Sequence, residues 1–127
     1  MAKYIEHRLI SMIATNDLTG KAGYAVALDT SNANQVVLAN AQTAPAIGIL
    51  LTEGKAGDVV GVILGQVGTA RAIYGGTVSI GNALTADSTG KLIATTTAAD
   101  QVIAIAKEAG VSGEMHEVIL CNKFYHA

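Results

Sequence analysis

The feature that most constrains the fold is an internal repeat, in which three blocks from the first half of the 127-residue sequence recur in the second half in the same order. The matching blocks are residues 22–29 with 80–87, 46–50 with 102–106, and 57–64 with 113–120. The first block keeps three matched pairs at one spacing, namely Gly23 with Gly81, Ala25 with Ala83, and Asp29 with Asp87. The spacing shortens afterwards because the polar loop at residues 31–34 is longer in the first copy, and an insertion in a turn costs little. The chain is therefore expected to fold as two similar units.

Each copy contains four short apolar runs that are separated by turn-forming residues. The runs lie at about residues 24–28, 35–39, 46–51 and 58–64 in the first copy and at about residues 83–86, 91–95, 101–107 and 115–120 in the second. Val, Ile and Thr are frequent in them, and β-branched side chains favour strands. Asp29 and Asp87 each follow the first run, where an aspartate bonds the backbone of a turn. Regularly spaced short strands predict an all-β fold, a compact small barrel or sandwich built from two similar β units at residues 22–64 and 80–120.

The length of the chain fits a single β domain, which we assign to residues 21–121. The linker between the copies, residues 65–79, alternates in polarity and predicts a linker strand. Residues 122–127 are expected to form a C-terminal tail. Residues 1–20 are expected to form an N-terminal arm or the first element of the body.

The N-terminal segment carries the candidate contact residues. It precedes the first copy, yet it has more apolar side chains than a solvated arm should expose. These side chains are Tyr4, Ile5, Leu9, Ile10, Met12 and Ile13. We expect residues 2–14 to be an attachment arm that docks on a partner or on another copy, so that its deletion leaves the body folded. The alternative is that the segment is the first strand or a short helix, because short apolar runs fit both.

The composition excludes several classes of function. Charged residues make up 14% of the chain, and the net charge is −2 with no basic stripe. Nucleic-acid binding needs clustered cations, and single-strand binding also needs aromatic platforms, whereas this chain has no Trp and one Phe. No apolar run approaches the ~20 residues that span a bilayer. The charged N-terminus lacks the apolar stretch of a signal peptide, so we expect synthesis in the cytoplasm. A charge-poor, apolar chain is typical of a protein that hides surface in an oligomer or a partner.

No motif in the sequence predicts catalysis. Residues 87–91 contain a Gly-Lys pair but lack the earlier Gly and the following Ser or Thr of a phosphate-binding loop. The histidines His7, His116 and His126 are too far apart for a zinc site on one element. The lone Cys121 sits within an apolar run and fits a small strand residue. We therefore expect no enzyme, with no catalytic residue, cofactor or metal site.

The repeated motifs resemble those of the small tailed-phage head decoration proteins, also called capsid cement proteins. The first copy carries the resemblance at residues 22–29, 46–49 and 57–62, and the second at residues 81–87, 90–91, 102–106 and 113–114. It covers about residues 20–120. The resemblance implies a compact β-rich homotrimer without catalytic residues. Such a protein sits on the capsid surface of the virion, after synthesis in the host cytoplasm, and clamps neighbouring subunits of the major capsid protein.

Two other functions remain open from the sequence. One is another structural phage β module, such as a fibre or tail component. The other is a β-barrel that binds a small molecule or a sugar, although sugar sites usually need stacked aromatic rings and the aromatic residues here are scattered. Neither nucleic acid nor a membrane is expected as a partner.

Overall fold

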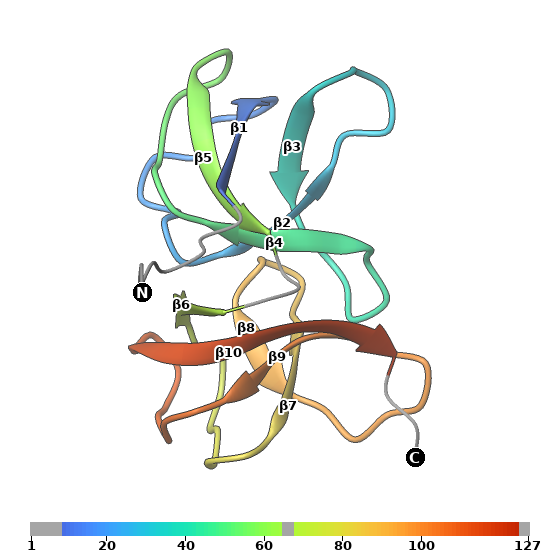
Figure 1. The fold of residues 1–127 in the computed structure, drawn as a ribbon, viewed down its shortest axis with the longest axis vertical. Coiled ribbons are helices and arrows are strands. Elements are labelled where there is room, and N and C mark those ends of the chain that lie inside the picture. Colours follow the sequence, from blue (N-terminus) through green and yellow to red (C-terminus); the bar gives the residue numbers. More distant parts are fainter. Residues whose placement is uncertain (1–8, 65–67, 125–127) are drawn as a thin grey trace, which may run out of the picture.

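The computed structural model describes residues 9–64 and 68–124, and these residues form ten β-strands and no helix. The strands are β1 (Leu9–Ala14), β2 (Ala25–Leu28), β3 (Gln35–Leu38), β4 (Ala46–Leu50), β5 (Val59–Leu64), β6 (Thr69–Ile73), β7 (Ala83–Ala86), β8 (Leu92–Ala94), β9 (Gln101–Ala106) and β10 (Met115–Phe124). Figure 1 shows two stacked bodies, a first unit of β1 to β5 and a second unit of β6 to β10. The all-β prediction of a small barrel is confirmed.

The first unit is a closed five-stranded barrel with the strand order β1-β3-β2-β4-β5. The pairings of β2 with β3, β2 with β4, β4 with β5 and β1 with β5 are antiparallel. The barrel closes where β1 runs parallel to β3, with Ile13 opposite Gln35 and Ala14 opposite Val36. Closure leaves the strands with an inner face that forms a core and an outer face toward the surroundings.

The strand pairings of the second unit match those of the first. When each strand of the first unit is replaced by the strand five places later, the closed order becomes β6-β8-β7-β9-β10. Read from β6 in the opposite direction around the barrel, this is the observed order β6-β10-β9-β7-β8. A parallel bridge between Tyr74 and Leu92 stands where β1 meets β3 in the first unit. The turns match as well, because the Asp29 amide donates to the Gln35 carbonyl over 2.9 Å and the Asp87 amide donates to the Lys91 carbonyl over 2.8 Å. Both aspartates thus occupy the same turn, as the sequence predicted.

Each unit has five strands, whereas the sequence predicted four. The eight predicted strands are all present, but β1 and β6 complete the two units from segments that were assigned elsewhere. The sequence favoured an attachment arm at residues 2–14. Residues 9–14 instead form β1, one of the strands of the barrel, and residues 2–8 lie outside the described residues. Likewise, the linker strand is β6, the first strand of the second unit. The last strand extends to Phe124, so residues 122–124 are not a tail, and residues 125–127 lie outside the described residues.

The two units are joined by an apolar cluster that contains residues of both. A first cluster, which includes Met12, Val36 and Val62, fills the barrel of the first unit. A second cluster fills the other unit and also takes in Ile49 and Ile63 from the first. Burial of apolar side chains stabilises by about 1.5–3 kcal/mol for each large residue. The two units are therefore held together by the same force that stabilises each of them.

A polar contact reinforces this junction. The loop after β3 brings Gln42 of the first unit onto the second, where its side-chain amide donates to the Asp100 carboxylate over 2.9 Å. The Gln42 carbonyl accepts from the Gln101 amide and from the Thr85 hydroxyl, both over 2.9 Å. Asp100 is buried and also accepts from the Thr95 hydroxyl over 2.6 Å. These bonds fix the relative placement of the two units.

Candidate functional site

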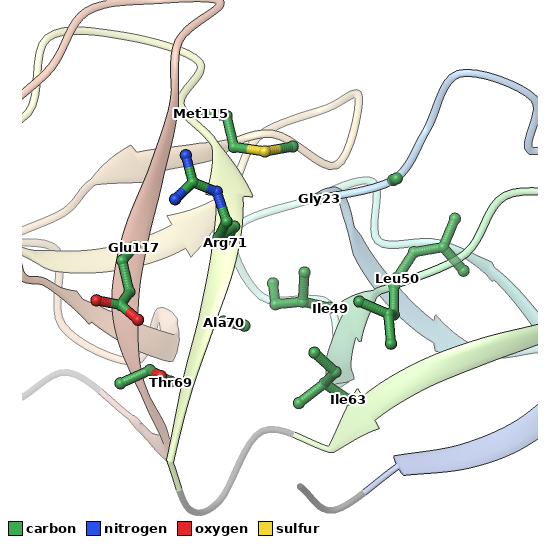
Figure 2. A pocket seen from close by; sticks show the side chains of 11 residues that line it. Gly23, Ile49, Leu50, Ile63, Thr69, Ala70, Arg71, Met115 and Glu117 are labelled. Atoms are coloured by element: carbon green, nitrogen blue, oxygen red, sulfur yellow. The ribbon is translucent and has the colours of Figure 1, made fainter.

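A groove of about 320 Å³ lies at the surface between the two units. Strands β4 and β5 and the loop before β2 supply one wall, and β6 and β10 supply the other (Figure 2). The lining residues are Ala22, Gly23, Ile49, Leu50, Leu51 and Ile63 from the first unit and Thr69, Ala70, Arg71, Met115 and Glu117 from the second. The groove thus lies where the surfaces of the two units meet.

The two walls of the groove differ in chemistry. The wall from the first unit is wholly apolar, whereas the wall from the second carries Arg71 and Glu117. Glu117 pairs with Lys107, which directly follows β9, and the hydrogen bond from Lys107 lowers the pKa of the Glu117 carboxyl. None of the described residues that line the groove is aromatic. This chemistry suits contact with an apolar segment and offers no stacking platform for a sugar ring.

The six candidate contact residues do not act as one group. Ile10 and Met12 pack in the core of the first barrel, which takes them away from any partner. Leu9 and Ile13 lie on the opposite face of β1, where Leu9 is 50% exposed and Ile13 is partly buried. Tyr4 and Ile5 lie outside the described residues. The division follows from the period-two alternation of a strand, which turns successive side chains to opposite faces.

The histidine that the sequence placed on a strand, His116, is the centre of a charged cluster. Its Nδ1 lies 2.9 Å from a Glu108 carboxylate oxygen, and its Nε2 lies 3.0 Å from a Glu114 carboxylate oxygen. These bonds, with Glu114 first, raise the pKa of the His116 imidazole and lower the pKa values of both carboxyls. The ring also packs against Tyr74, whose buried hydroxyl donates to the Glu108 carbonyl over 2.7 Å. The cluster ties the loop after β9 to strands β6 and β10.

The two turn aspartates act on local backbone. Asp29 accepts from the Ser31 amide over 2.8 Å, and Asp87 accepts from the Thr89 amide over the same distance. Hydrogen bonds from Asn32, Ser31 and Thr15 lower the pKa of the Asp29 carboxyl to about 2. Both side chains are used in stabilising their turns, which is the role that the sequence predicted for them.

The described residues were also compared with the requirements of a metal site and of a membrane-spanning helix, and they meet neither. Within residues 9–64 and 68–124, no group of three or more His, Cys, Asp or Glu side chains is arranged to hold a metal ion. Every buried side-chain nitrogen or oxygen in this part of the chain has a hydrogen-bond partner. No helix among the described residues is long and apolar enough to cross a membrane.

The fold has a counterpart among known structures. The crystal structure of the head fiber gp8.5 N base in bacteriophage phi29 matches 93% of this chain and 98% of that chain, with a TM-score of 0.73 and 18% sequence identity. The two proteins share a fold. No family model and no curated protein matches the sequence. The comparison therefore shows that the fold of nearly the whole chain also occurs in a phage head fibre protein.

Sequence reasoning missed the residues that join the two units. Gln42 and Asp100 lie in polar loops that look like ordinary turns, and nothing in their spacing shows that they meet. Tyr74 was assigned to a linker, yet it is completely buried. Its place in the sequence could have indicated this burial, because an alternating run that ends in a large aromatic residue is typical of a buried strand.

Proposed function

We propose that this protein is a structural component of a phage virion that binds the outer surface of the head as a homotrimer and clamps neighbouring subunits of the major capsid protein. The observation that carries the proposal is the match of nearly the whole chain to the base of a phage head fibre. The cement-like motifs of the two copies support the same location independently. The partners are the major capsid protein and further copies of this chain.

The physical build of the protein suits such a role. A clamp must be rigid, and here one apolar cluster spans both units and buried hydrogen bonds join them. Symmetric copies that each make modest contacts gain avidity, since the second and third contacts form at high effective concentration. A charge-poor surface of aliphatic side chains is also suited to subunit interfaces.

The match to a head fibre base favours a second candidate function. That protein is the base of a head fibre, so this chain could attach a fibre to the head without stabilising the capsid. Both functions require binding to the outside of the head. They differ in whether the bound protein makes the capsid shell more resistant to disruption.

Binding to heads that lack the protein separates these possibilities. Purified protein is mixed with such heads, sedimented, and quantified in the pellet, with heads already saturated by the protein as a control. We expect saturable binding to the deficient heads and none to the saturated ones. Heat release of DNA from the heads is then measured. A higher release temperature supports clamping, an unchanged one supports the fibre base, and no binding contradicts both.

A further inference from the structure

We propose that residues 3–8 of this chain bind in the groove between the two units, where they add a strand to the edge of β6 in the same molecule. Residues 1–8 lie outside the described residues, so the support comes from the edge of β6, from the groove beside it and from the position of Leu9. The proposal goes beyond the proposed function, because it assigns an occupant to a surface within the protein and does not depend on binding to heads.

Strand β6 is paired with another strand along one side only. It stands at the end of the strand order of the second unit, next to β10. The Tyr74 amide at its end donates to the Glu114 carbonyl over 2.9 Å, which shows that residues at even positions turn their backbone groups toward β10. Successive residues of a strand turn these groups to opposite sides. Thr69 and Arg71 therefore point their N–H and C=O groups away from β10, along what we call the free edge of β6.

The free edge of β6 faces the groove. The next residue with this orientation, Ile73, donates its amide to the Gly23 carbonyl over 3.0 Å, and Gly23 lines the groove. Figure 2 shows β6 running along the groove with Ile63 across from it. Among residues 9–64 and 68–124, none bonds the backbone of Thr69 or Arg71 on this side. Such an edge is a template for a further strand, which gains main-chain hydrogen bonds when it pairs.

The described chain begins beside the groove. Leu9 lies opposite Ile63, which lines the groove. Because β1 and β5 are antiparallel, the segment before Leu9 leaves the first barrel on the side where the chain continues from Leu64 toward β6. An extended chain spans about 3.3 Å per residue, so eight residues reach about 26 Å and the five of β6 span about 16 Å. The segment before Leu9 can therefore reach the free edge of β6 while β1 stays in the barrel.

The segment also matches the groove in chemistry. Tyr4 and Ile5 offer large apolar side chains to the apolar wall that the first unit supplies. Arg71 on the other wall forms no ion pair with a described residue, and Glu6 is the one acid among residues 1–8. A tethered segment also binds at a high effective concentration, which favours it over a separate partner.

Hydrogen exchange at single amides tests the proposal. It is measured by nuclear magnetic resonance in the full-length protein and in a variant that lacks residues 2–8. The Ala72 amide, which points toward β10, is the matched control, and the rates of the Thr69 and Arg71 amides are each divided by its rate to remove any general change in stability. We expect both ratios to be at least about tenfold higher in the variant, because the deletion removes the acceptors of these amides. Equal ratios in the two proteins, or amides that are unprotected in the full-length protein, would overturn the proposal.

A substituted full-length chain keeps the test decisive if the deletion fails to fold. Tyr4→Asp combined with Ile5→Asp keeps the length of the segment but puts charges against the apolar wall. Ser88→Asp combined with Ser112→Asp adds the same charges at exposed turns of the second unit. We expect the first pair to raise the exchange ratios several-fold and the second pair to leave them unchanged. Ratios that neither pair changes would contradict the proposal.

Two further outcomes would assign the groove to another occupant. If protection of Thr69 and Arg71 in the full-length protein falls on dilution, a second copy supplies the segment and the assignment to the same molecule is wrong. If a peptide that covers β6 is protected only in protein bound to deficient heads, as measured by exchange and mass spectrometry, the capsid covers the free edge. The proposal is then wrong, while the proposed function stands.

Discussion

At the scale of single residues, His116 links stability to pH. Its pKa is raised in the folded protein by Glu114 and Glu108, so its contribution to stability is fully present below the ordinary value of 6.5 and is lost as the pH rises through the raised value. The pKa values of the two carboxyls are lowered from 4.5, so their contribution is present above that value and is lost as the pH falls through the lowered values. The cluster therefore stabilises the fold most in the interval between these limits.

Replacing the histidine isolates the alkaline limit. We expect His116→Gln to lower the free energy of unfolding at pH 6 and to have a smaller effect at pH 9, because the ion pairs weaken as the pH rises through the raised pKa of the imidazole. Urea unfolding at several pH values measures this. A difference between the two proteins that stays constant from pH 6 to pH 9 would show that the ion pairs do not contribute.

Gly90 carries the strictest backbone requirement at the junction of the units. Its φ is +92°, its carbonyl accepts from the Ala25 amide over 2.7 Å, and an added Cβ would lie 3.2 Å from the Ala25 carbonyl oxygen. Gly113 has a similar φ of +90° but open space around it. We expect Gly113→Ala to cost about 1–2 kcal/mol from the left-handed conformation alone, and Gly90→Ala to cost more. Urea unfolding measures the free energy of unfolding of both variants. An equal loss for the two would mean that the backbone at the junction shifts to accommodate the added Cβ.

At the scale of elements, β1 decides whether the first barrel closes. It pairs with β5 over five residues and with β3 over two, and it supplies Met12 and Ala14 to the core. We expect deletion of residues 2–14 to abolish cooperative unfolding, whereas deletion of residues 2–8 retains it. Circular dichroism during heating measures both. A folded protein without residues 2–14 would restore the arm that the sequence favoured.

The sequence predicted the eight strands of the two copies because Asx turns and glycines separate them clearly, and it predicted β6 as a linker strand from its alternation. It missed the role of β1 because both faces of that strand are apolar, with Leu9 and Ile13 outside and Ile10 and Met12 inside, and this hides the alternation. Its antiparallel partner β5 is also distant in sequence, and long-range pairing leaves no local pattern. The assignment of β6 to a linker follows from the same cause, since the repeat was recognised only from its second strand onward.

At the scale of the whole molecule, the two units should unfold as one. One apolar cluster contains Ile49 and Ile63 of the first unit together with the core of the second, and the bond between Gln42 and Asp100 crosses the junction. We expect a single calorimetric transition whose calorimetric and van't Hoff enthalpies agree. Two separate transitions would mean that the units are independent domains.

The buried carboxylate of Asp100 tests how much the polar contact contributes. We expect Asp100→Ala to cost about 1–3 kcal/mol, because it leaves the buried Thr95 hydroxyl without its acceptor. Asp17→Ala serves as the control, since Asp17 bonds only within an exposed turn and its loss should cost about 0.5 kcal/mol or less. Urea unfolding measures both. Equal losses for the two variants would show that the junction does not depend on this contact.

The interaction surfaces could be predicted only in part. Composition indicated a protein that covers apolar surface, and Leu9 and Ile13 were among the residues chosen for contact. Val59 and Gly61 lie beside β1 as well, and only the register of β1 against β5 shows that these residues are neighbours. The groove likewise depends on how two barrels stack, which no local sequence pattern encodes.

The central claim is that this protein sits on the outside of a phage head, and cryo-electron microscopy of heads with and without the protein tests it most directly. We expect additional density on the outer surface of heads that carry the protein, at junctions between capsid subunits. Three copies of the structure should fit into this density. Identical head surfaces in the two reconstructions, or density for the protein on the tail alone, would contradict it.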